Sequence, residues 1–200
     1  MMSTTRPTGL RLAGFAATAL GGLLVGLGSI LGWATVTIGG AGGTTGLPPI
    51  DTKGIDTLEG KLALLSGVLV LVAIPAMRLA RAVAGRRSWA ILIIVAGLAA
   101  TGLAAKDLSR PTDRFGDLGF EKVVKGISDT TGLPLQGLEN RFRAQAKKLT
   151  HVSLGPGIYL VIAGGLLAAA GGGLGLAWAN RTTSPPTAEP IEEAPGAAPG

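Results

Sequence analysis

The feature that most constrains this chain is a set of four long apolar runs that contain no charged residue. The runs cover residues 12–33, 62–77, 88–105 and 157–178. The first and last are 22 residues long, enough at a rise of about 1.5 Å per residue to cross a hydrocarbon core of roughly 30 Å. The middle two are shorter, but cations flank them, and the stems of those side chains can extend toward the headgroups. We therefore predict an all-α fold, an integral membrane four-helix bundle built from two transmembrane hairpins.

The composition agrees with this prediction. Only 15% of the residues are charged, the mean hydropathy is +0.47, and soluble domains of this size seldom contain four such runs. Arg6 and Arg11 precede the first run as they would in a signal peptide. That run is longer than the apolar core of about 7–15 residues in a signal peptide, so we expect a retained membrane anchor.

Charge sets the expected orientation. The connection 78–87 holds four arginines and no acidic residue, which by the positive-inside rule places it in the cytoplasm. The connection 106–156 holds nine Lys and Arg residues, and a raw count would favour the opposite topology, but the rule applies best to short loops. We expect a multi-pass protein of the cell (plasma) membrane with both termini cytoplasmic. The predicted segments outside the spans are the cytoplasmic tail 1–11, extracytoplasmic loop 34–61, basic turn 78–87, extracytoplasmic loop 106–156 and disordered cytoplasmic tail 179–200.

Three tryptophans, Trp33, Trp89 and Trp178, lie at the ends of the predicted spans. Tryptophan is enriched at membrane interfaces, so we predict that all three lie at headgroup level. The net charge of +6 is spread over loops on both faces, which does not suggest a nucleic-acid-binding surface. Anionic lipid headgroups are the expected counter-charge.

The loop 106–156 is the only extramembrane segment long enough to fold. Apolar residues recur at helical spacing, first from Phe120 to Ile127 and again from Leu135 to Leu149, and basic residues share the second helix. Such a basic amphipathic helix can lie on the bilayer, cover its own bundle or bind a partner. The candidate contact residues are Leu135, Leu138, Arg141, Phe142, Lys147, Lys148 and Leu149.

The chain lacks the residue patterns of common catalytic sites. It has no cysteine and one histidine, His151, so neither a catalytic triad nor a metal site with two histidines is expected. The segment 54–62 is similar to a phosphate-binding loop, but its glycines are one residue too far apart and Leu62 replaces the required Ser or Thr. We expect no cofactor, no bound metal and no enzymatic activity.

The first extracytoplasmic loop re-enters the membrane through a polar segment. Asp56 or Thr57 is placed to cap the second span, because such side chains accept hydrogen bonds from free N–H groups at helix starts. An alternative is that Asp51, Asp56 and Glu59 form an acidic site for a cation.

Small residues repeat every four positions in the first and fourth spans. Such faces let helix backbones approach closely in lipid, either inside the bundle or in a homo-oligomer or partner complex. The two predicted packing faces are Gly14, Thr18, Gly22 and Gly26, and Gly164, Ala168 and Gly172 beside Gly165, Ala169 and Gly173.

The arginine-rich turn, the G-x-D-T-x-x-G-K sequence from Gly54 to Lys61 and the tail rich in Pro, Ala and Glu resemble those of small, uncharacterised four-span membrane proteins of high-GC Gram-positive bacteria. The resemblance implies the four-span layout and carries over no functional residue. Claudins and tetraspanins share that layout, but their loop cysteines are missing here.

Two functional hypotheses follow. The first is a non-enzymatic accessory or scaffold subunit of a bacterial cell-envelope complex, with the loop 106–156 contacting a membrane-protein partner or a second copy. The second is a small passive channel or lipid-handling transport protein, in which Thr18, Ser66, Thr101 or the glycine faces would line a path.

Overall fold

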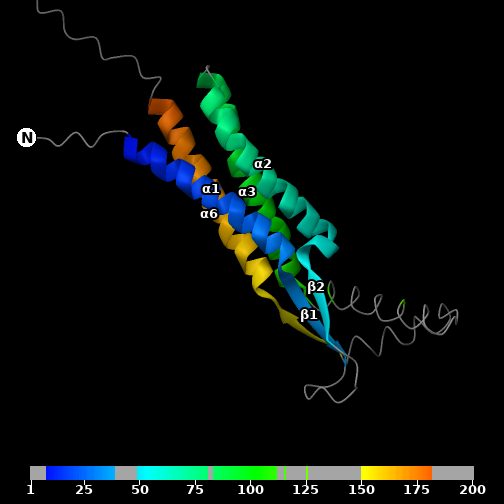
Figure 1. The fold of residues 1–200 in the computed structure, drawn as a ribbon. Coiled ribbons are helices and arrows are strands. Elements are labelled where there is room, and N and C mark those ends of the chain that lie inside the picture. The colour runs from blue at the N-terminus through cyan, green and yellow to red at the C-terminus, as the bar shows by residue number, and fades with distance from the viewer. Residues whose placement is uncertain are drawn as a thin grey trace, which may run out of the picture.

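Four long helices form an up-down-up-down bundle in the computed structural model (Figure 1), which describes residues 8–38, 49–80, 83–111, 115, 125 and 150–181. The helices are α1 (Thr8–Ile30), α2 (Leu58–Leu79), α3 (Val83–Ser109) and α6 (Pro156–Arg181). Each helix packs against two neighbours in the cyclic order α1, α2, α3, α6, while the diagonal pairs barely touch. The predicted all-α four-helix bundle is confirmed.

The bundle has two ends that differ in construction. The start of α1, the connection between α2 and α3 and the end of α6 lie together at one end, which we call the tail end. The other end, which we call the sheet end, carries a three-stranded antiparallel sheet (Figure 1).

The middle helices extend well beyond the uncharged runs from which they were predicted. Helix α2 begins four residues before Leu62 and ends two after Met77. Helix α3 includes Arg86 and Arg87 near its start and Asp107 near its end. Arginine, lysine and glutamate are good helix formers, so the helical hydrogen bonds continue through most of the charged residues that flank the uncharged runs. Each helix is therefore long enough to cross a membrane.

The sheet was not predicted from the sequence. Its strands are β1 (Gly32–Ile38), β2 (Ile50–Lys53) and β3 (Thr150–Leu154), in the order β2-β1-β3. Strand β1 pairs Thr35 with Asp51 on one side and with Ser153 on the other. The predicted first span ran to Trp33, but α1 ends at Ile30 and Trp33 belongs to β1. The four consecutive β-branched residues from Thr35 to Ile38 favour a strand.

One apolar core connects the sheet to the bundle. Trp33, Ala34 and Val36 from β1 lie in the same buried cluster as residues of all four helices. The helix and connecting residues of this cluster are Val25, Ala63, Ala100, Ala104, Phe115, Ile158 and Val161. Because the core is continuous, the sheet and the sheet end of the bundle form one packed unit.

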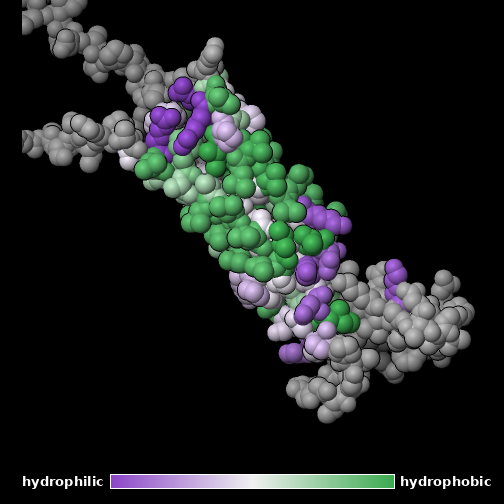
Figure 2. Space-filling model, viewed as in Figure 1, coloured by the Kyte–Doolittle hydropathy of each residue, from purple (hydrophilic) through white to green (hydrophobic). Residues whose placement is uncertain are grey.

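Large apolar side chains cover the outside of the bundle between its two ends. Figure 2 shows this apolar band, with hydrophilic residues gathered at both ends. Leu12, on α1, is 69% exposed and Leu65, on α2, is 63% exposed. Others are Leu20, Leu23, Leu27, Val72, Ile91, Val95, Leu98 and Leu166. A contiguous apolar surface of this extent is typical of helices that face lipid.

Candidate functional site

Helices α1 and α6 pack with their backbones in close approach through glycines spaced seven residues apart. Gly14, Gly21 and Gly28 on α1 face Gly171, Gly164 and Gly157 on α6, in antiparallel order. A Cβ atom added at Gly164 would lie 2.7 Å from the Gly21 carbonyl oxygen, and one added at Gly28 would lie 2.7 Å from the Gly157 carbonyl oxygen. At all of these positions except Gly14, where a Cβ atom would lie 3.2 Å from the Leu174 Cβ, no larger side chain fits between the two helices without moving a backbone.

The predicted small-residue faces lie only partly in this interface. Gly14, Thr18, Gly164 and Ala168 take part in it. The other members face elsewhere: Gly22 lies against Leu71 and Val70 of α2, Gly172 lies against Ile93 and Ile94 of α3, and Gly26 has open space where a Cβ would be. The reason is geometric, because a step of four residues turns an α-helix by about 400°. A row with four-residue spacing therefore drifts around the helix, whereas a seven-residue repeat stays closer to one face.

The two threonines predicted to line a transport path lie in tight contacts between helices. Thr18 is 2% exposed and its hydroxyl donates to the Gly14 carbonyl oxygen at 2.8 Å. Thr101 donates to the Gly97 carbonyl oxygen at 3.0 Å and lies against Gly165 of α6. Both hydroxyls thus bond to carbonyl groups of their own helices, and the Thr101 hydroxyl is also 3.5 Å from the Ile162 carbonyl oxygen of α6.

An aromatic side chain organises the sheet end. Trp33 is completely buried, and its indole Nε1–H donates to the Gly28 carbonyl oxygen at 2.8 Å. A Cβ atom at Gly54 would overlap the Trp33 ring, so only glycine fits against it. The backbone N–H of Gly155 donates to the Trp33 carbonyl oxygen at 2.7 Å. Trp33 thus packs inside the protein core, and its placement at headgroup level stays a prediction.

The G-x-D-T-x-x-G sequence beginning at Gly54 closes around this tryptophan. Thr57 caps α2, as predicted for Asp56 or Thr57: its hydroxyl accepts from the Gly60 N–H at 3.0 Å. The same hydroxyl donates to the Gly54 carbonyl oxygen at 2.8 Å, and Gly60 packs directly on Gly54. The Asp56 carboxylate accepts from the Lys53 N–H at 3.2 Å. We call Trp33, Gly54, Thr57 and Gly60 the clasp.

The clasp explains the segment that is similar to a phosphate-binding loop. Its glycines allow contact with a tryptophan ring and with another backbone, and its threonine caps a helix. The three acidic residues proposed for a cation site are not gathered around one point. Among the described residues, no group of three His, Cys, Asp or Glu side chains is arranged to hold a metal ion.

The sheet presents a polar face away from the core. Thr35 donates to the Asp51 carboxylate at 2.8 Å across β1 and β2, and Thr37 donates to the His151 carbonyl oxygen at 3.2 Å. The side chains of His151 and Ser153 are exposed. The alternation of buried and polar positions is that of a sheet with one face covered and one face open.

Arginines and aromatic rings from all four helices meet at the tail end. Arg11 lies over the Trp178 ring, with 4.9 Å from Cζ to the ring centroid, and Arg78 lies over the Phe15 ring at 4.6 Å. Arg86 is 5.4 Å from the Trp178 centroid and Arg11 is 5.7 Å from the Phe15 centroid. The order is therefore Arg78, Phe15, Arg11, Trp178, Arg86, which we call the arginine–aromatic ladder.

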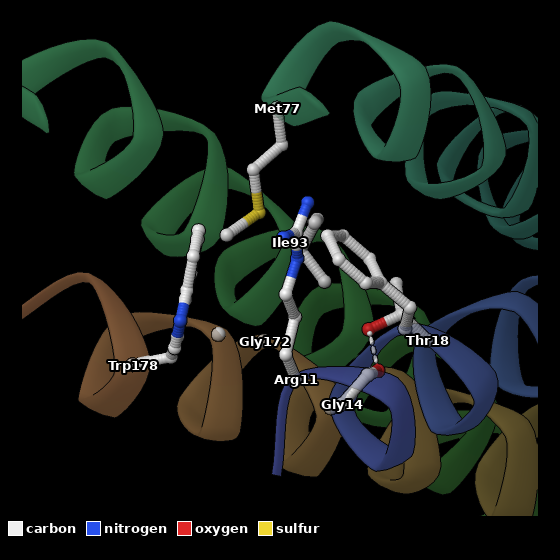
Figure 3. Close-up of a pocket in the computed structure, with 10 residues that line it drawn as sticks. Arg11, Gly14, Thr18, Met77, Ile93, Gly172 and Trp178 are labelled. Carbon is white, nitrogen blue, oxygen red and sulfur yellow. Dashed lines mark hydrogen bonds between the residues drawn. The ribbon is translucent and has the colours of Figure 1, made fainter. Parts of the chain in front are cut away.

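Figure 3 shows the environment of Arg11. Its side chain extends between Trp178 on one side and Thr18 on the other, with Met77 and Ile93 from the facing helices nearby. The cavity that these residues line has a volume of only about 10 Å³, room for roughly one water molecule. The ladder therefore covers a nearly filled core and not an open passage. Sequence reasoning missed the ladder because its residues lie far apart in the chain.

A shallow apolar groove runs along the surface between α2 and α3. Ser66, the third residue predicted to line a transport path, lies in this groove with Ser88. The remaining lining residues are Leu69, Ile91, Leu92, Val95 and Ala96. The groove lies within the apolar band and is open to the side, toward the position of lipid.

The predicted contact residues of the loop 106–156 mostly lie outside the described residues. These are Leu135, Leu138, Arg141, Phe142, Lys147, Lys148 and Leu149. Within that loop, Phe115 is buried in the core shared by the sheet and the bundle, and β3 begins at Thr150. Both Phe115 and β3 thus connect the loop to the sheet end.

The fold and its surface define a multi-pass membrane protein with four apolar helices of spanning length. No protein-family model matches the chain, and no curated protein sequence matches it.

Proposed function

We propose that this protein is a non-enzymatic accessory or scaffold subunit of a bacterial cell-envelope complex. In this proposal it resides in the plasma membrane with its tail end in the cytoplasm. The contact surface is the sheet end, extended by the loop 106–156. A membrane-protein partner or a second copy of the chain would bind there.

The continuous core between the sheet and the bundle is the observation that carries this proposal. Strand β1 is fixed by Trp33, strand β3 by its pairing with β1 and by the Gly155 hydrogen bond, and β2 by the clasp that follows it. The segment 39–48 and the longer segment 112–149 therefore begin and end on one packed platform. A surface presented on a rigid base loses less conformational entropy on binding than one on a flexible tether.

The interior of the bundle supports a packing role over a conducting one. A pore needs a polar or wet path, whereas α1, α3 and α6 meet through glycines whose backbones are in contact. The threonine hydroxyls at these contacts donate to backbone carbonyl groups, of their own helices and, for Thr101, also of α6. The interfaces between these helices are thus suited to holding the bundle together.

The test is affinity purification of the full chain in a mild detergent, with the tag on the C-terminal tail, followed by mass spectrometry. We expect a stoichiometric partner or a defined homo-oligomer whose formation is lost in the Phe142→Asp, Leu149→Asp double variant. A matched control is Gly9→Asp, Ala84→Asp, which adds the same charge at two exposed positions of the tail end, away from the proposed contact surface. Unchanged association of the Phe142→Asp, Leu149→Asp protein would refute the assignment of the contact surface.

The groove between α2 and α3 favours a second candidate, a lipid-handling protein. An acyl chain could lie against its apolar lining, and Ser66 and Ser88 would contact polar atoms nearer the headgroup. The distinguishing experiment is transfer of a fluorescent phospholipid between leaflets of proteoliposomes. Transfer that is abolished by Ala96→Trp, which fills the groove, while helix content is retained, would support this candidate over the scaffold.

A further inference from the structure

We propose that the tail end binds the phosphate group of an anionic phospholipid through Arg11, Arg78 and Arg86. The site is the outward side of the arginine–aromatic ladder. This inference is independent of the proposed scaffold function.

The first step is the gathering of like charges. Arg11 and Arg78 share the Phe15 ring, and Arg11 and Arg86 share the Trp178 ring, each with its Cζ atom within 5.7 Å of a ring centroid. The rings stabilise each cation by about 0.5–1 kcal/mol at an exposed site. They do not remove the repulsion between cations held on a common ring, so an anion beside them would lower the energy of the arrangement.

The second step is the separation of acidic from basic residues along the bundle. Every described carboxylate lies at the sheet end: Asp51 on β2, Asp56 and Glu59 around the start of α2, and Asp107 near the end of α3. The described part of the tail end thus carries arginines and no carboxylate. Its counter-charge has to come from outside these residues.

The third step is position. The ladder residues belong to the tail end, where Figure 2 shows hydrophilic residues beyond the apolar band. In a bilayer, the end of such a band corresponds to the level of the lipid headgroups. Arg11 and Arg78 are exposed and Arg86 is half-buried. The small cavity beneath Arg11 is too small for an anion, so the ligand has to bind on the outward side. A planar guanidinium with five N–H donors matches a phosphate oxygen pair.

Two other anions compete for the same cations. Inorganic phosphate offers the same chemistry from solution, and Glu189, Glu192 and Glu193 lie in the tail that follows α6. The lipid is favoured because the membrane holds its headgroups at the depth of the ladder at high local concentration.

The experiment is native mass spectrometry of the full chain purified in detergent with equal amounts of phosphatidylglycerol and phosphatidylcholine. We expect the protein to retain phosphatidylglycerol preferentially. The variant Arg11→Gln, Arg78→Gln, Arg86→Gln should lose this preference, because each cation near an anionic group changes the affinity by about fivefold. The matched control is Lys53→Gln, Lys61→Gln, Lys106→Gln, which removes three exposed cations from the sheet end. It should behave as the unmodified protein.

The outcomes separate the alternatives. Equal retention of both lipids, or equal loss of preference in the two triple variants, would overturn the inference. Displacement of phosphatidylglycerol by excess inorganic phosphate would assign the site to a soluble anion. A preference that appears only when residues 185–200 are deleted would assign it to the chain's own tail. If circular dichroism shows that the triple arginine variant does not fold, Arg78→Gln alone should weaken retention by about fivefold, and unchanged retention would refute the site.

Discussion

The two ends of the bundle stabilise the same four helices by opposite means. At the sheet end, the contacts around Trp33 are neutral: a buried indole, backbone carbonyls, a threonine cap and glycines that allow backbones to touch. At the tail end, three guanidinium groups lie over two aromatic rings. The stability of the sheet end therefore depends mainly on how closely its groups pack, and the stability of the tail end depends on charge and on the surrounding medium.

The tryptophans make this difference concrete. Trp33 and Trp178 both lie near the ends of apolar runs, and the sequence alone gives them the same expected role. Trp33 is fully buried and bonded to Gly28, whereas Trp178 is half-buried between two arginines. The same residue type at similar positions thus serves as core in one place and as a surface platform for cations in the other.

The largest expected effect is the loss of the Trp33 side chain. Trp33→Ala should lower the free energy of unfolding by about 3–5 kcal/mol, the range for a fully buried aromatic residue. Trp178→Ala should lower the free energy of unfolding by about 1–2 kcal/mol. The half-buried Trp178 side chain buries less apolar area than Trp33, and its removal also eliminates two cation–π contacts. The measurement is reversible unfolding in mixed detergent micelles followed by circular dichroism. Equal destabilisation by the two substitutions would contradict the proposed difference between the two ends of the bundle.

The next effect compares a glycine packed against Trp33 at the sheet end with a glycine at the tail end that has room for a side chain. In Gly54→Ala the new methyl group would overlap the Trp33 ring, and overpacking of this kind costs about 1–3 kcal/mol. Gly85, near the start of α3, is the matched glycine at the tail end, and a Cβ there would meet the Ala80 Cβ at 3.4 Å, an ordinary contact. Gly85→Ala should be neutral or stabilising by up to about 1 kcal/mol, because alanine favours the helix.

Thermal unfolding of the two alanine variants in the same detergent measures this pair. If Gly54→Ala were as stable as Gly85→Ala, the clasp would have room that the structure does not show. The glycine at position 54 would then have a role other than packing against Trp33.

Features that depend on neighbouring residues could be predicted from the sequence, and features that depend on residues far apart in the chain could not. The spans follow from composition over about 20 residues, and the Thr57 cap follows from a local pattern, since both are properties of neighbouring residues. The sheet was missed because β2 has four residues and β3 has five. Strands this short are stabilised mainly by pairing with segments far away in the chain.

The packing faces show the same limit within a helix. Of the residues that four-residue spacing selected, Gly14, Thr18, Gly164 and Ala168 lie in the α1–α6 interface, but this spacing does not show which partner each later glycine meets. The seven-residue series of Gly14, Gly21 and Gly28 was present in the sequence. Together with Gly157, Gly164 and Gly171 on α6, this series was the stronger sequence signal for the α1–α6 interface. The ladder had no local signal at all, since Phe15, Arg78 and Trp178 come together only when three helices pack.

A smaller effect compares one hydroxyl group at each end. Thr57→Ala removes the cap of α2 and should cost about 1 kcal/mol. Ser88→Ala at the tail end removes an exposed hydroxyl that donates to the Ala84 carbonyl oxygen, a change expected to stay within about 0.5 kcal/mol. Hydrogen exchange at the first turn of α2 should rise in the Thr57 variant alone. A similar rise in the Ser88 variant would indicate that loss of either hydroxyl loosens the whole bundle.

The smallest expected effect is the coupling between Phe15 and Arg78, and it tests the tail end directly. Arg78→Gln removes a cation–π contact and also relieves repulsion with Arg11, so its net effect on stability should be small. In the Phe15→Leu background the ring is absent and only the relief remains, so the same substitution should become stabilising. A double-mutant cycle should therefore give a coupling of about 0.5–1 kcal/mol. Added salt should shrink the repulsive part by screening, because both guanidinium groups are exposed. A coupling near zero at low salt would mean that the ring does not hold the cation, and the contrast between a shape-dependent and a charge-dependent end would then rest on Trp178 alone.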